Sequence, residues 1–188
     1  MGKKRRIQLA ALAFAMLGGL VWLVMPSSEP VYNGKPVSYY IRNQPFTIPR
    51  MDSNAVPYLV KGVETRDGAP SRAYSTLWNK LPLSLRSLFP APVPAERVRF
   101  RAIAALSQMG GDAEPAIPAL VHALRTDEND TVRALAATTL GNVGKNDKMA
   151  TDALVDAFKG DKSSAVRPYA GRALQHIDPE AAAKAGVE

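Results

Sequence analysis

One helical pattern occurs three times in the C-terminal half of this chain, and each copy starts 34 residues after the one before it. Every copy opens with Val-Arg and then places alanine, leucine and a closing apolar residue at the same intervals. The copies are Val98-Arg99…Ala102…Leu106…Met109, Val132-Arg133…Ala136…Leu140…Val143 and Val166-Arg167…Ala170…Leu174…Ile177. A fixed period of this length predicts a stacked helical solenoid, because each unit buries its apolar face only against its neighbours. The expected fold class is therefore all-α, a short α-α superhelix.

Glycine positions indicate where several helices of the stack end. Gly110 and Gly111 follow the first helix, and Gly144 and Gly160 follow two later ones, as is common just past a helix C-terminus. Between these stops, apolar residues recur at helical spacing. We expect helices over residues 95–109, 114–125, 131–143, 151–159 and 165–177, with a short capping helix over 179–185.

A more degenerate unit precedes the three clear ones. Residues 55–63 parallel residues 116–124, and a partner helix is expected over 71–80, with Arg72 in the place of the Val-Arg arginine. Residues 81–94 contain four prolines and break the period, so this segment is interpreted as an insertion. Its large apolar residues either cover the stack or form an exposed apolar loop; they are Leu83, Leu85, Leu88 and Phe89.

The N-terminal residues predict a membrane anchor. Ile7 to Met25 is a run of 19 residues in which Gln8 is the strongly polar member. As a helix it would be about 28 Å long, close to the thickness of the hydrocarbon core of a bilayer. The basic residues before it are expected to stay in the cytoplasm, which places the repeat domain outside, in the periplasm if the source is bacterial. Cleavage of a signal peptide and secretion is the alternative, but residues 25–28 contain no small-x-small site and include Pro26.

The expected organisation follows from these segments. It comprises a basic cytoplasmic tail (1–6), a transmembrane signal anchor (7–25), a linker with a short helix at 36–43 (26–52), and a helical repeat domain (53–188) that contains the proline-rich insertion (81–94).

The net charge of +7 reflects membrane targeting more than ligand binding. Four of the 24 basic residues lie at positions 3–6, and without them 20 basic residues face 17 acidic ones. A remainder of +3 is small for a protein that grips a polyanion. Nucleic acid is therefore not expected as a partner.

The three copies resemble the HEAT repeat family, in particular the short HEAT-like units of the phycobilisome-lyase type. The resemblance rests on the Val-Arg openings, on the alanine and leucine positions, and on Asp127 and Asp161, which precede Arg133 and Arg167 by six residues. It covers residues 98–188 clearly and the earlier unit weakly. The resemblance implies that these arginines and aspartates form a ladder between successive units. It also implies that the second helix of each unit lines the concave side.

Residue types that catalysis or metal binding requires are scarce. Cysteine is absent, which excludes disulfides, a thiol nucleophile and a cysteine metal site. His122 is expected on the solvent side of a second helix, and His176 in the last turn of a first helix, where a partly charged ring suits the helix C-terminus. Neither is followed by glutamate, so the His-Glu ligands of the di-iron hydroxylase built from such repeats are missing. We expect no catalytic residues, no metal site and no cofactor.

The main functional hypothesis is a membrane-anchored adaptor or scaffold that binds a protein partner without catalysis. The alternatives are a bilin or chromophore lyase of the HEAT-like lyase family and a purely structural spacer. A small-molecule substrate is not expected. The candidate partner-binding residues are those expected to be exposed on the second helices, namely Lys61, Glu114, His122, Arg125, Asp156 and Lys159.

Overall fold

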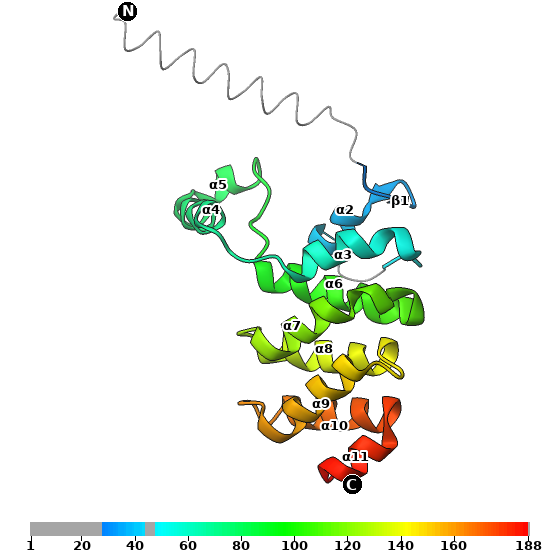
Figure 1. Cartoon of the computed structure of the whole chain (residues 1–188). Helices are drawn as coiled ribbons and strands as arrows, with labels where there is room; N and C mark the ends of the chain where they lie inside the picture. Colours follow the sequence, from blue (N-terminus) through cyan, green and yellow to red (C-terminus); the bar gives the residue numbers. More distant parts are fainter. Residues whose placement is uncertain (1–27, 44–47, 188) are drawn as a thin grey trace, which may run out of the picture.

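A computed structural model describes residues 28–43 and 48–187 (Figure 1). The predicted tail (1–6) and anchor (7–25) lie outside the described residues. Within the described residues, no helix is both long enough and apolar enough to cross a membrane.

The helices stack in two layers, as the 34-residue period predicts. One layer consists of α6 (Ala95–Met109), α8 (Asp130–Val143) and α10 (Val166–Ile177), each packed against the next. The other consists of α3 (Val56–Val63), α7 (Ile117–Thr126) and α9 (Lys148–Gly160). Figure 1 shows these helices in sequence order from one end of the molecule to the other. The prediction of an all-α solenoid is confirmed for this part of the chain.

The core lies between the two layers. The repeated leucines Leu106, Leu140 and Leu174 are fully buried, and so are the repeated alanines that face the neighbouring units. Gly141 on α8 allows close approach to α10, because a Cβ atom there would lie 2.9 Å from the Cβ atom of Ala173. The apolar residues repeated in each copy therefore form the buried seam of the stack, that is, the contact between its helices.

The connecting and terminal elements complete the stack. The 3-10 helix η1 (Ser53–Ala55) leads into α3, and η2 (Gly110–Ala116) joins α6 to α7. At the other end α11 (Pro179–Ala185) packs against α9 and α10, which confirms the predicted capping helix.

The N-terminal segment differs from its prediction. Strands β1 (Val31–Tyr32) and β2 (Lys35–Pro36) form an antiparallel hairpin where a linker was expected. Asn33 and Gly34 both adopt positive φ angles, 47° and 74°, which are the angles of a two-residue type I′ turn. The Asn-Gly dipeptide is a signal for such a turn that the linker interpretation overlooked.

The short helix expected over 36–43 is present as α2 (Val37–Asn43), and it belongs to the stack. It buries Val37, Tyr40 and Ile41 and packs against α3 and α6. Arg101 of α6 also donates a hydrogen bond to the carbonyl of Arg42, at 2.6 Å.

The partner helix expected over 71–80 does not pack as predicted. Helix α4 (Ala69–Lys80) forms there, but none of its residues is buried, and Arg72 is exposed. Helix α3 packs instead against α2 and α6. The prediction of a first-layer partner at 71–80 was wrong. Helices α4 and α5 (Leu83–Arg86) are inserted between α3 and α6, and α6 packs against α3 in the place where α4 was expected.

Candidate interaction surfaces of the stack

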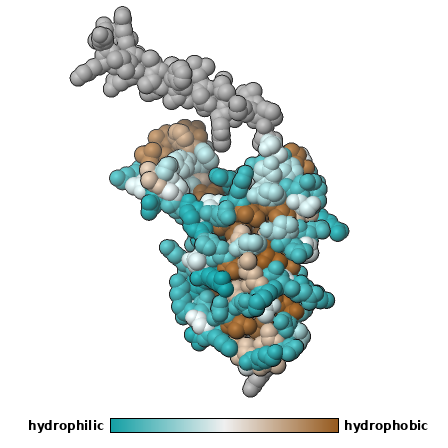
Figure 2. Space-filling view, in the orientation of Figure 1, coloured by the Kyte–Doolittle hydropathy of each residue, from teal (hydrophilic) through white to brown (hydrophobic). Residues whose placement is uncertain are grey.

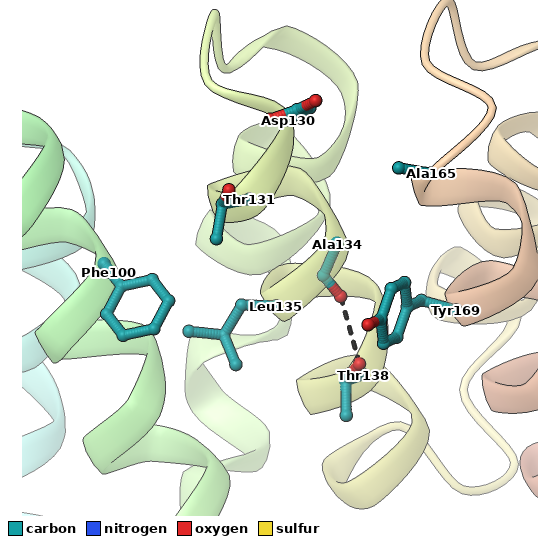
Figure 3. Close-up of a pocket in the computed structure, with 8 residues that line it drawn as sticks. All are labelled: Phe100, Asp130, Thr131, Ala134, Leu135, Thr138, Ala165 and Tyr169. Carbon is teal, nitrogen blue, oxygen red and sulfur yellow. Dashed lines mark hydrogen bonds between the residues drawn. The ribbon is translucent and has the colours of Figure 1, made fainter.

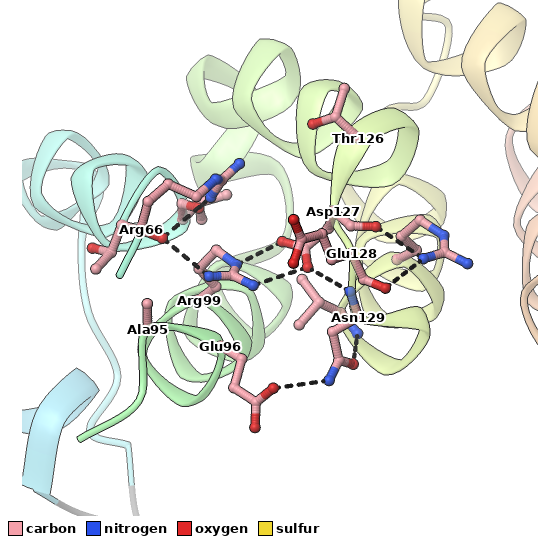
Figure 4. A network of polar contacts seen from close by, with 12 residues as sticks. Arg66, Ala95, Glu96, Arg99, Thr126, Asp127, Glu128 and Asn129 are labelled. Carbon is pink, nitrogen blue, oxygen red and sulfur yellow. Dashed lines mark hydrogen bonds and ion pairs between the residues drawn. The ribbon is translucent and has the colours of Figure 1, made fainter. Parts of the chain in front are cut away.

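Buried arginine–aspartate pairs join the turns at one edge of the stack. Arg99 of α6 donates two hydrogen bonds to Asp127 in the α7–α8 turn, at 2.6 Å from Nε and 3.0 Å from Nη2 (Figure 4). Its Nη1 atom donates to the carbonyl of Thr65, which follows α3. The Asp127 side chain is fully buried, and that of Arg99 is 9% exposed. Such bidentate pairing fixes the geometry of both turns.

The second pair repeats this geometry one unit later. Arg133 of α8 donates to both carboxylate oxygens of Asp161 at 2.9 Å, and its Nη1 donates to the carbonyl of Asp127. Arg167 of α10 donates to the carbonyl of Asp161 but is itself exposed, at the last repeat of the stack. The ladder that the resemblance implied is therefore present.

Electrostatics agree with a structural role for these pairs. Burial alone would raise the pKa of Asp161, but hydrogen bonds from Arg133 and from the Ser163 amide outweigh it, and the pKa lies below its ordinary value. The hydrogen bond to Asp161 also raises the pKa of Arg133. Two of the three repeated arginines are thus occupied inside the protein.

The six residues predicted for partner binding are all exposed. Arg125 and Asp156 form an ion pair at 3.1 Å that joins α7 to α9, and both side chains are at least 48% exposed. The ammonium group of Lys61 lies 5.3 Å from the ring of Tyr58. His122 is solvent-facing, as predicted, and lies within hydrogen-bond distance of the Thr126 hydroxyl. Arg125 and Asp156 are thus the two of these six described residues that are paired with each other.

His122 also lines a polar hollow at the edge of the stack. This hollow, of about 540 Å³, lies beside the Arg99–Asp127 pair. Its lining carries charges of both signs, from Arg66, Arg72 and Glu96 among others.

The exposed side of the layer formed by α6, α8 and α10 carries an apolar groove that was not predicted. Phe100 of α6, Leu135 of α8 and Tyr169 of α10 line a groove of about 300 Å³ (Figure 3). Phe100 is 39% exposed and Tyr169 is 44% exposed. Threonines line it between the apolar groups, and Asp130 lies at the start of α8. Leu135 and Tyr169 occupy the same place in consecutive copies, so the large apolar side chains at the solvent positions of the repeat were the missed signal.

A second hollow extends the groove along α8 and α10. It also measures about 300 Å³, and it shares Thr138 and Tyr169 with the first. Arg172 lies 5.4 Å from the Tyr169 ring, and Nδ1 of His176 donates to the Gly141 carbonyl at 2.7 Å. His176 thus ties α10 to α8, in the last turn where it was expected. The two hollows together form a strip with aromatic and basic side chains.

Within residues 28–43 and 48–187, no group of three or more His, Asp or Glu side chains could hold a metal ion.

Comparisons with known proteins agree with the repeat architecture. The family of HEAT repeats matches residues 92–141 and 117–185, which together span α6 to α11. No curated protein and no solved structure matches the chain. The family match covers half of the sequence and coincides with the ladder and the buried seam. The chain therefore belongs to the HEAT-repeat family.

Proposed function

We propose that this protein is a membrane-tethered HEAT-repeat scaffold that binds a segment of a partner protein in the groove formed by α6, α8 and α10. HEAT repeats generally mediate contacts between proteins, because a stack of helices offers a long continuous surface. The tether is the predicted anchor at residues 7–25.

The groove of Phe100, Leu135 and Tyr169 is the observation that carries the proposal. Contiguous large apolar side chains that are exposed to water mark an interaction site more often than a bare surface. A groove lined by them suits an apolar side chain of a partner. Asp130 adds a negative charge at one end, so a partner segment that carries an apolar anchor beside a basic residue complements this surface. Aromatic side chains of this kind are common among the residues that dominate binding energy.

Photo-crosslinking in intact membranes tests which face binds. A benzophenone amino acid placed at Phe100 or at Tyr169 is expected to cross-link one and the same partner protein. Leu135→Glu should abolish both products, because it puts a carboxylate into the floor of the groove. Positions 125 and 156, on the charged face, serve as matched exposed controls.

Products that arise only from positions 125 and 156 would assign binding to the second-layer residues Lys61, Glu114, His122, Arg125, Asp156 and Lys159 and overturn the groove. Products from neither face would favour the structural spacer. A visible absorption band in the purified full chain would favour the chromophore lyase. Release of the chain from membranes by alkaline carbonate would overturn the tether.

A further inference from the structure

The segment that separates α3 from α6 has an unusual composition. Residues 68–94 contain no aspartate or glutamate, and their charged side chains are Arg72, Lys80 and Arg86. The same segment holds five leucines and three aromatic residues. Basic residues combined with leucine, tryptophan and phenylalanine are typical of helices that lie in the surface of a lipid bilayer.

We name residues 68–94 the α4–α5 excursion. Most of its large apolar side chains are exposed to solvent. Leu83 is 81% exposed, Leu88 is 71% exposed and Leu77 is 59% exposed. Six of the ten large hydrophobic side chains that are exposed in the described residues belong to this excursion. Figure 2 shows the resulting hydrophobic surface over α4 and α5, at the upper left. Of the two interpretations drawn from sequence, the exposed apolar loop is correct.

Hydrogen bonds within the excursion hold its shape. Arg86 donates to the carbonyls of Asn79 and Leu81, at 2.9 and 3.0 Å. The Tyr74 hydroxyl donates to the carbonyl of Pro90, and the Tyr74 ring lies 6.4 Å from that of Trp78. Helix α4 and α5 therefore form an ordered hairpin whose apolar groups are not used to cover the stack.

The excursion lies at the end of the stack nearest to the predicted anchor. The Tyr58 hydroxyl in α3 donates to the carbonyl of Ser28 at 2.8 Å, which fixes the first described residue against that end. Figure 1 shows β1, α2, α4 and α5 at this end and α11 at the other. Only two residues separate Met25 from Ser28, so Ser28 lies within about 10 Å of the end of the predicted membrane span.

We propose that the α4–α5 excursion inserts its apolar side chains into the surface of the bilayer that holds the anchor, with its exposed basic side chains, Arg72 and Lys80, at anionic lipid headgroups. This inference rests on the membrane tether of the proposed function. A bilayer is favoured over a protein partner by the charge of the excursion, by its lack of acidic residues and by its position near Ser28. Anchor and excursion together make two attachments, which would hold the stack in one orientation on the membrane.

Tryptophan fluorescence offers a direct test, because the chain has two tryptophans. In the full chain carrying Trp22→Phe, reconstituted into protein-free vesicles of phosphatidylcholine and phosphatidylglycerol, Trp78 is the single reporter. We expect a blue-shifted emission, loss of fluorescence with lipids brominated near the headgroup, and protection from acrylamide. The triple variant Leu83→Ser/Leu88→Ser/Phe89→Ser should reverse all three effects. The variant Met149→Ser, in which a residue 49% exposed on α9 is changed, should leave them intact.

The outcomes separate this inference from the proposed tether. If the chain stays with the vesicles after alkaline carbonate while Trp78 remains open to acrylamide and unaffected by brominated lipid, membrane insertion is wrong and the tether stands. If Trp78 is quenched by brominated lipid before the wash and the chain is then released, insertion stands and the tether is wrong. Protection of Trp78 that requires added membrane proteins would assign the excursion to a protein partner and overturn the inference.

Discussion

Two junctions in this molecule lead from a second-layer helix to a first-layer helix, one through a short turn and the other through a long segment. The α7–α8 turn leads from the second layer to the first within three residues, Asp127 to Asn129. The α3–α6 junction makes the same step but contains the α4–α5 excursion. In the short turn Asp127 is fully buried against Arg99, and Asn129 accepts hydrogen bonds from the first amides of α8.

The long junction is also tied to Arg99, through a backbone carbonyl instead of a carboxylate, and it adds a projecting hairpin. Thr65 still accepts a hydrogen bond from Arg99, and Asp67 accepts one from the amide of Ala95, where α6 begins. Both ends of the junction are thus tied to the stack, while none of residues 68–94 is buried. The ladder side of the stack can therefore accept a long insertion, because both ends of the connection are held and the cost of closing a longer loop grows only slowly with its length.

Removal of a buried carboxylate from the short turn should have the largest effect. Asp127→Ala leaves the buried Arg99 guanidinium without its carboxylate partner and is expected to lower the free energy of unfolding by about 3–5 kcal/mol. Urea unfolding of the full chain in detergent, followed by circular dichroism, measures this. Asp127→Asn should cost less, because the amide oxygen can still accept from the Asn129 backbone. A loss below about 1 kcal/mol for Asp127→Ala would mean that the ladder is dispensable.

The second-largest loss of stability is expected from a steric clash between α8 and α10. Gly141→Ala places a Cβ atom 3.0 Å from the Ala173 Cα atom, so α8 and α10 must separate, at a cost of about 1–3 kcal/mol. Gly160→Ala is the matched control, since a Cβ atom there meets nothing within 4 Å. Equal midpoints in thermal unfolding for the two variants would argue against close packing of these helices.

Acid should weaken the ladder in a defined range. In the folded state, the pKa of Asp161 lies below the ordinary aspartate value of about 4. Its contribution to stability is therefore complete above that ordinary value and is lost as the pH falls through the lower, folded-state pKa. Unfolding free energies measured from pH 7 down to pH 2 should show a smaller acid-induced loss in Asp161→Asn than in the wild type. Identical slopes in the two proteins would contradict this linkage.

The excursion should contribute least to folding stability. Leu83→Ser/Leu88→Ser is expected to change the free energy of unfolding in detergent by less than about 0.5 kcal/mol, because both side chains are exposed and touch no part of the core. A larger loss in the same urea titration would show that these leucines cover the stack after all.

Most of the stack could be predicted from sequence, whereas the surfaces could not. Helix α6 begins and ends at the predicted residues, and α8 and α10 differ by one residue at their starts. Helical periodicity reports which side chains are buried in a seam, so Leu106, Leu140 and Leu174 were identifiable. The groove at Phe100 and Tyr169 was missed, because a pattern of buried positions carries no information about large side chains outside it.

The stacked architecture follows from the amino-acid sequence alone, because a 34-residue repeat of small and branched apolar residues can bury its surface only against its own copies. Glycines also mark where two first-layer helices end, because Gly110 follows α6 with a positive φ of 59° and Gly144 follows α8. Helix α2 joins the stack and α4 stays outside it, and this difference depends on tertiary contacts, because both sequences are compatible with a helix. Helix α2 packs against α3 and α6, whereas α4 has no buried residue, and the local sequence of neither helix specifies this difference.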